Sequence, residues 1–116
     1  EVRVLRDMVL EDRGLIGDPP ALSLANRRFH KQIHLASHNR YLVQQLDLVH
    51  RTMALMATTS LAAEGRSAIA QSEHDAIVRA IEAGDEDAAD KALCSHISVA
   101  FMTRLKRDAA YRKDQS

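Results

Sequence analysis

Three of the six histidines in this chain occupy positions where helical periodicity calls for a core-facing apolar residue. His74 shares a helical face with Ala70 and Ile77, and His30 and His96 also fall among apolar neighbours. A buried imidazole that leaves a ring nitrogen unpaired costs about 1–3 kcal/mol. One such residue is usually a hydrogen-bonded core histidine, whereas three of them in separate predicted helices favour a common site.

The spacing of these residues predicts that they meet. Asn26 and His30 are four residues apart, so one helical turn stacks them on the same face. His74 lies ten residues before a predicted turn at 84–85, and His96 lies eleven residues after it. At a rise of ~1.5 Å per residue, both imidazoles should lie roughly 15 Å from the turn of an antiparallel hairpin. Two side chains from one helix and one from each arm of the hairpin could then converge on a point.

Three imidazoles and one amide oxygen are a donor set that suits Zn²⁺, Ni²⁺, Co²⁺ or Mn²⁺, with zinc as our first expectation. The amide of Asn26 is neutral, so it should hold a cation less tightly than a carboxylate would. Spacing alone leaves two interpretations open. One is a divalent transition metal centre, and the other is a polar bundle core without an ion.

The elements that must position these residues are all helical. No stretch shows the alternation of a strand, and helical periodicity predicts helices over residues 1–13, 19–38, 40–60, 67–83 and 85–112. The predicted boundaries rest on Asp18 followed by Pro19, on Asn39, and on Gly84 followed by Asp85. In the helix over 40–60, the apolar seam is Leu42, Leu46, Val49, Met53 and Met56. We therefore predict an all-α, antiparallel bundle of about five to six helices.

Composition excludes several classes of protein. The length of 116 residues fits a single domain over 1–116. Because 16 basic residues balance 16 acidic ones, we do not expect this domain to have a DNA-binding surface of its own. No apolar run approaches the ~20 residues of a membrane span. The single cysteine, Cys94, fits a reducing, cytoplasmic setting, and its spacing to Ile97 and Phe101 predicts core packing.

Several short motifs follow one another in a definite order along the chain. They are Asn-Arg-Arg-Phe-His (26–30), Ala-Ser-His-Asn (36–39), Ser-Glu-His-Asp-Ala-Ile (72–77), Ala-Gly-Asp (83–85) and a lone His96. Together with the ligand spacings of 4 and 22 residues, this order resembles the FCD domain over roughly residues 18 to 105. The FCD domain is the C-terminal effector-binding domain of FadR-like transcription regulators of the GntR superfamily.

The resemblance implies a bundle of six or seven helices that forms a homodimer. It also implies a central metal held by Asn26, His30, His74 and His96, although the family usually has Asp at the first of these positions. Such domains bind small organic acids, such as hydroxyacids, ketoacids or sugar acids, beside the metal or directly on it. A winged helix–turn–helix domain that binds DNA should precede this domain and is not in this chain. The segment before His30 is shorter than usual, so we expect the first helix to be absent or rearranged.

The other polar candidates have alternative interpretations. His34, one turn beyond His30, could reach the effector or could be an exposed flank of the helix. We expect His38 and His50 on the surface, and Glu73 as a solvated carboxylate or part of an ion pair between helices. The sequence does not choose among three arginines that could clamp a carboxylate, namely Arg3, Arg27 and Arg51.

Three functions compete at this point. The first is an effector-sensing domain of a transcription regulator, which binds a small organic acid and acts on DNA through a dimer and a separate domain. The second is a metal-dependent helical-bundle enzyme, a hydrolase or an oxygen-activating protein, because three histidines with open positions can activate water. The chain lacks the Glu-x-x-His pair of di-iron bundles, so we expect no enzyme. The third is a structural bundle with an empty polar centre.

Overall fold

The computed structural model describes residues 1–53 and 65–115, and within these ranges it contains helices and turns but no strand. Its elements are α1 (Val2–Asp12), the 3₁₀ turn η1 (Arg13–Leu15), α2 (Pro19–Ala36), α3 (Arg40–Met53), α4 (Arg66–Glu82) and α5 (Glu86–Gln115). The predicted all-α fold is therefore confirmed, and the five helices of the described residues agree with the predicted number.

The predicted helix starts are confirmed by side-chain caps. Asp18, Asn39 and Asp85 each accept a hydrogen bond from the backbone N–H three residues later, at 3.3, 3.1 and 3.0 Å. Gly84 ends α4 in the left-handed conformation, with a φ of +68°, which a residue with a Cβ adopts only with strain. These local signals create the tight turn between α4 and α5.

The helix ends differ from prediction by a few residues. A 3₁₀ turn follows α1 before the chain reaches Gly17, α2 ends two residues earlier than predicted, and α5 continues to Gln115. The predicted helix over 40–60 is described only as far as Met53, so its remainder lies outside the described residues. None of the described helices is both long enough and apolar enough to cross a bilayer.

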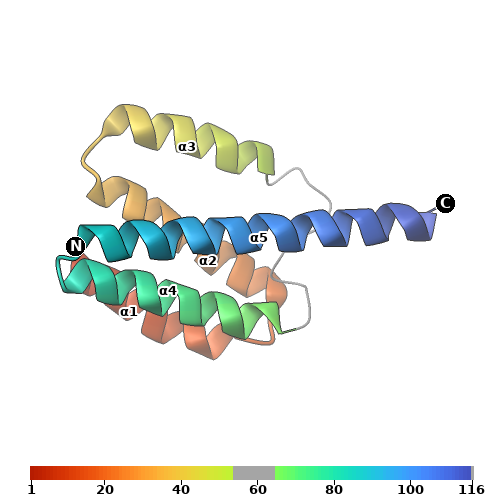
Figure 1. The fold of residues 1–116 in the computed structure, drawn as a ribbon, viewed down its shortest axis with the longest axis horizontal. Coiled ribbons are helices and arrows are strands. Elements are labelled where there is room, and N and C mark those ends of the chain that lie inside the picture. Colours follow the sequence, from red (N-terminus) through yellow and green to blue (C-terminus); the bar gives the residue numbers. More distant parts are fainter. Residues whose placement is uncertain (54–64, 116) are drawn as a thin grey trace.

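Figure 1 shows α5 as the long central helix, with α4 running alongside it in the opposite direction. On the other side of α4 lies α1, which also packs on α2, and α2 in turn packs on α3. The C-terminal part of α5 projects beyond the other helices (Figure 1), which gives the molecule its longest extent of 49 Å. Side chains of α2 reach both α4 and α5, because Phe29 stacks on His74 and His30 lies beside His96.

The apolar core explains why α1, α2 and α4 stay together. Leu5 and Val9 of α1, Phe29 of α2 and Val78 of α4 form one cluster of fully buried side chains. Burying each of the larger side chains stabilises the fold by about 1.5–3 kcal/mol. Since Phe29 directly precedes His30, this core also fixes the segment of α2 that carries the first predicted histidine.

Ion pairs reinforce the contact between α1 and α4. The Asp75 carboxylate binds Arg6 of α1, Arg79 of its own helix at 2.8 Å, and Arg13 at 3.5 Å. Arg6 reaches Glu82 as well. The hydrogen bond from Arg6 is the main reason why the pKa of Asp75 lies below its ordinary value. The first helix is thus fixed to the helix that carries His74.

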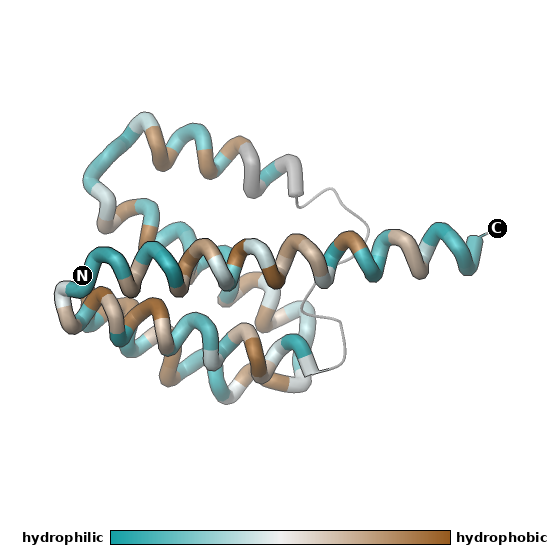
Figure 2. Tube along the Cα trace, viewed as in Figure 1, coloured by the Kyte–Doolittle hydropathy of each residue, from teal (hydrophilic) through white to brown (hydrophobic). Residues whose placement is uncertain are grey.

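The predicted core packing of Cys94 is wrong, because its face of α5 is exposed. Cys94 is exposed, and Ile97 and Phe101, which share its face, are 55% and 60% exposed. Side chains two positions apart on a helix diverge by ~200°. Cys94 therefore points outward because His96, two residues later, points inward. Figure 2 shows hydrophobic and hydrophilic positions alternating along the whole of α5. In the predicted seam of the helix over 40–60, Leu42 is 42% exposed and Leu46 is half-buried, whereas the side chains of Val49, Met53 and Met56 lie outside the described residues.

Candidate metal centre

Three histidines from three helices converge in the bundle interior. The Nε2 atom of His96, on α5, lies 3.2 Å from Nε2 of His74 on α4 and 3.2 Å from Nε2 of His30 on α2. All three ligand atoms lie within 4.8 Å of one another. His74 and His96 are buried, and His30 is half-buried. The left-handed turn at Gly84 brings His74 and His96 to the same height along the α4–α5 hairpin, as their spacing from the turn predicts.

A carboxylate fixes the tautomer of His96. Nδ1 of this ring lies 2.8 Å from Oε1 of Glu73, which also binds Nη2 of the buried Arg66 at 2.7 Å. An ionised carboxylate can only accept, so Nδ1–H of His96 donates to Glu73. The neutral ring then has a lone pair on Nε2, the nitrogen that faces the other two histidines. A carboxylate behind a histidine in this way is the usual support of a metal-binding imidazole.

The ring of His74 is held by packing. It stacks on the buried ring of Phe29, with centroids 4.2 Å apart and an interplanar angle of 19°. Its Nδ1 atom has no hydrogen-bond partner among the described residues. No described residue therefore fixes the tautomer of His74 from the Nδ1 side, and the stacking on Phe29 sets the plane of its ring.

The electrostatics keep these rings neutral at physiological pH. Burial, followed by the charges of His30, His96 and Arg66, lowers the pKa of His74 from 6.5 to about 2. Burial also lowers the pKa of His96, although Glu73 opposes this shift. Burial alone would raise the pKa of Glu73, but its hydrogen bonds with Arg66 and His96 lower it. A neutral imidazole is the form that binds a metal.

The distances fit a divalent transition metal. Two nitrogens bound to one ion at about 2.1 Å are separated by about 3.0–3.4 Å, depending on whether the coordination angle is octahedral or tetrahedral. Both contacts of the His96 Nε2 atom, at 3.2 Å, fall in this range. The donor set of His30, His74 and His96 could therefore hold a metal ion.

Comparison with known proteins identifies the family. The family model of the FCD domain matches residues 1–99. The chain belongs to the FCD domain family. No curated protein and no solved structure shows a significant match to it. The resemblance carried by the short sequence motifs is thus confirmed, and the family match extends to the N-terminal helix α1.

Within this FCD domain, the other predicted site residues lie on α2 or beyond it. Asn26 is half-buried one turn before His30, and its role as the fourth ligand stays a prediction. His34 is half-buried one turn after His30. The side chain of His38 is 71% exposed and pairs with Glu1 at 2.9 Å, as expected for a surface residue. The side chain of His50 lies outside the described residues.

Sequence reasoning missed Arg66 and did not connect Glu73 with this centre. Glu73 was expected to be solvated or to pair with another helix, and it does pair with α5, but through a histidine of the site. Arg66 is 4% exposed, and its Nε and Nη1 atoms have no hydrogen-bond partner among the described residues. The three arginines suggested by the sequence are instead exposed, namely Arg3, Arg27 and Arg51. The position of Glu73 directly before His74 was the one available signal.

Proposed function

We propose that this FCD domain is the effector-sensing part of a GntR-type transcription regulator. In this proposal Asn26, His30, His74 and His96 hold one divalent metal ion, most simply Zn²⁺, and a small organic acid binds beside it. The convergence of three histidine Nε2 atoms at the meeting point of α2, α4 and α5 is the observation that carries the proposal.

The charge of the centre favours an anionic effector. Four neutral ligands leave the +2 charge of the ion uncompensated, and Glu73 is already paired with the Arg66 guanidinium. Arg66 still has buried N–H groups without a partner in the described part of the chain. A carboxylate next to the metal would supply the missing negative charge, and a guanidinium is well suited to bind it.

Signalling requires two further parts. We propose that the domain forms a homodimer and that a DNA-binding domain is attached to it in the complete regulator, which would act in the cytoplasm. Because α2, α4 and α5 each contribute a histidine, an acid that binds the metal and displaces it would move ligands on three helices at once. Such a movement could change the arrangement of the dimer, which is the usual way in which a sensor controls an attached domain.

Metal analysis is the first test. Elemental analysis of the purified protein, before and after loading with Zn²⁺, Ni²⁺, Co²⁺ or Mn²⁺, should find about one ion per chain. His74→Ala and His96→Ala should each lose this ion, whereas His38→Ala, at the exposed histidine, should keep it. Full retention in both of the first two variants would refute the site.

Effector sensing has a separate test. Thermal unfolding of metal-loaded protein should shift upward with at least one of lactate, pyruvate and gluconate, which represent hydroxyacids, ketoacids and sugar acids. A chelator should remove the shift, and Arg66→Gln should reduce it more than Arg27→Gln at an exposed position. A flat response of loaded protein to a broad panel of acids would count against sensing.

The alternative of a metal-dependent enzyme has one supporting observation, the three-histidine donor set itself. Hydrolysis also needs a general base, and the carboxylate of Glu73 already accepts hydrogen bonds from Arg66 and His96. We therefore favour sensing. Turnover of an acid that stabilises the protein would favour the enzyme instead.

A further inference from the structure

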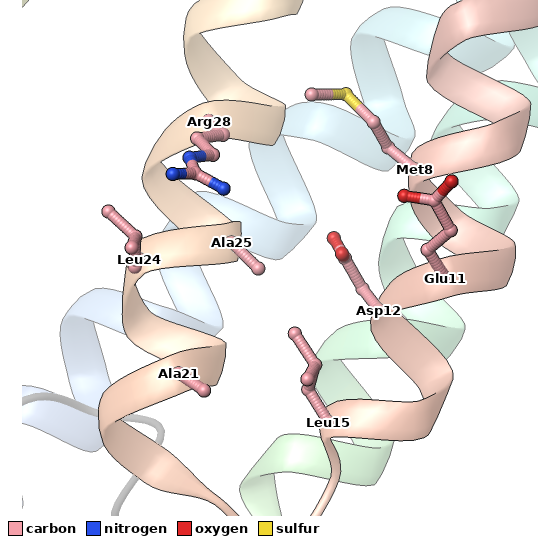
Figure 3. A pocket seen from close by; sticks show the side chains of 8 residues that line it. All are labelled: Met8, Glu11, Asp12, Leu15, Ala21, Leu24, Ala25 and Arg28. Carbon is pink, nitrogen blue, oxygen red and sulfur yellow. The ribbon is translucent and has the colours of Figure 1, made fainter.

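A second pocket lies away from the metal centre, between α1 and α2. Its volume is about 410 Å³, and Met8, Leu15 and Leu24 form much of its apolar wall. Figure 3 shows that Asp12, at the end of α1, and Arg28, on α2, face this space from opposite sides. A volume of this size is within the usual range for pockets that bind small molecules.

The Asp12 carboxylate is the unusual feature of this pocket. Asp12 is 7% exposed, and it makes no hydrogen bond or ion pair with any described residue. In Figure 3 its carboxylate points into the space between the helices. Burial, together with the charge of Glu11, raises its pKa, and Arg28 opposes this shift only through a longer-range attraction. Because most of its surroundings are protein, this carboxylate is less well hydrated than an exposed one, and a cation that enters the pocket would stabilise its charged form.

Arg28 is the complementary charge on the other wall. Its guanidinium forms no ion pair within the described ranges, and it lies too far from Asp12 to form one. The pocket therefore presents the Arg28 cation on α2 and two carboxylates on α1, the buried Asp12 and the exposed Glu11, with apolar side chains between them. A bridging molecule with both charges would satisfy the two walls at the same time.

We propose that this pocket binds a small aliphatic α-amino acid. The ammonium group of the ligand would pair with Asp12, its carboxylate with Arg28, and its side chain would lie against Met8 and Leu24. A simple organic acid would leave Asp12 without a partner and would be repelled by it, and a simple amine would leave Arg28 without one. The zwitterion is the smallest common chemistry that satisfies both groups.

This site is separate from the metal centre. Arg28 and His30 are two residues apart on α2, so their side chains diverge by ~200°. The same helix thus presents His30 to α4 and α5 and presents Arg28 to the pocket beside α1. An amino acid that bound to the metal instead would require that ion, so binding to chelator-treated protein distinguishes the two locations.

Calorimetric titration of the whole chain with L-leucine, in the presence of a chelator, tests the proposal. We expect saturable binding at millimolar concentration or tighter. Asp12→Asn and Arg28→Gln should each weaken it at least about tenfold, because each removes one charge-assisted pair. Asp7→Asn and Arg27→Gln, at exposed positions of the same two helices, should leave it unchanged. Circular dichroism would confirm that each variant is folded.

Two analogues separate the contributions of the two charges. We expect 4-methylpentanoate, which lacks the ammonium group, and 3-methylbutylamine, which lacks the carboxylate, to bind at least about tenfold more weakly than leucine. Absence of leucine binding to folded protein would overturn the proposal. Binding of either analogue as tight as that of leucine, or equal losses in the control variants, would overturn it as well.

Discussion

Replacing Glu73 by Gln should weaken metal binding while leaving all proposed ligands in place. Glu73 accepts Nδ1–H of His96 at 2.8 Å and holds Arg66 at 2.7 Å. The amide of the variant can still accept a hydrogen bond from the imidazole, but it no longer carries the negative charge that supports the ligand and neutralises Arg66. The variant therefore tests the charge more than the geometry.

The magnitude follows from the distance between the carboxylate and the ion. The length of the hydrogen bond, the imidazole ring and the metal–nitrogen bond together place an ion at His96 Nε2 about 7 Å from the charge of Glu73. At an effective dielectric constant of about 20, this attraction would be about 5 kcal/mol, an upper bound because Arg66 cancels much of it. Removing the carboxylate behind a ligand histidine commonly costs 10- to 100-fold in affinity, or about 1.4–2.8 kcal/mol.

The assay is a competition for Zn²⁺ between the protein and a coloured chelator at a fixed, neutral pH. Glu82→Gln is the matched control, because Glu82 also lies on α4 and also pairs with an arginine, but it is exposed and pairs with α1. Thermal melts would show that both variants are folded. An unchanged affinity in Glu73→Gln, or an equal loss in Glu82→Gln, would refute the assigned role of Glu73.

Three further predictions concern the ligand set, the pH response and the fold. Asn26→Asp should tighten Zn²⁺ binding by about tenfold or more in the same assay, because it adds a negatively charged ligand beside the ion. Weaker binding in this variant would mean that Asn26 is not a ligand. Without metal, the unfolding free energy should fall by about 2 kcal/mol from pH 7 to pH 5, because His74, whose pKa is about 2 in the folded chain and 6.5 as a free side chain, takes up a proton only on unfolding. Urea titrations should show a smaller pH dependence of the unfolding free energy in His74→Gln, and an equal pH dependence would contradict this reasoning. Asp75→Asn should lower stability to urea by about 1–3 kcal/mol, because Arg6 and Arg79 lose their shared partner, whereas Asp87→Asn at an exposed position should change little. A loss in Asp75→Asn no larger than in that control would contradict the role of this ion pair.

Local chemistry determined the helices and the height of the histidines. Asp18, Asn39 and Asp85 cap the helices they were predicted to cap, because a cap depends on backbone groups only three residues away. The same turn at Gly84 places His74 opposite His96, because both arms of a helical hairpin rise by the same amount per residue.

Tertiary packing decided which side of each helix is buried and which polar groups meet. Cys94 and His96 both fall among apolar neighbours in the sequence, and only the contact of α5 with α4 and α2 selects the face of His96. The pairing of Glu73 with His96, and the separation of Asp12 from Arg28, likewise depend on where neighbouring helices lie. Helix periodicity is a property of one segment, whereas the partner of a buried charge is set by elements far away in the chain. Helical signals in the sequence therefore determined the helices and the heights of His74 and His96, and the packing of the bundle determined the groups that surround the three histidines.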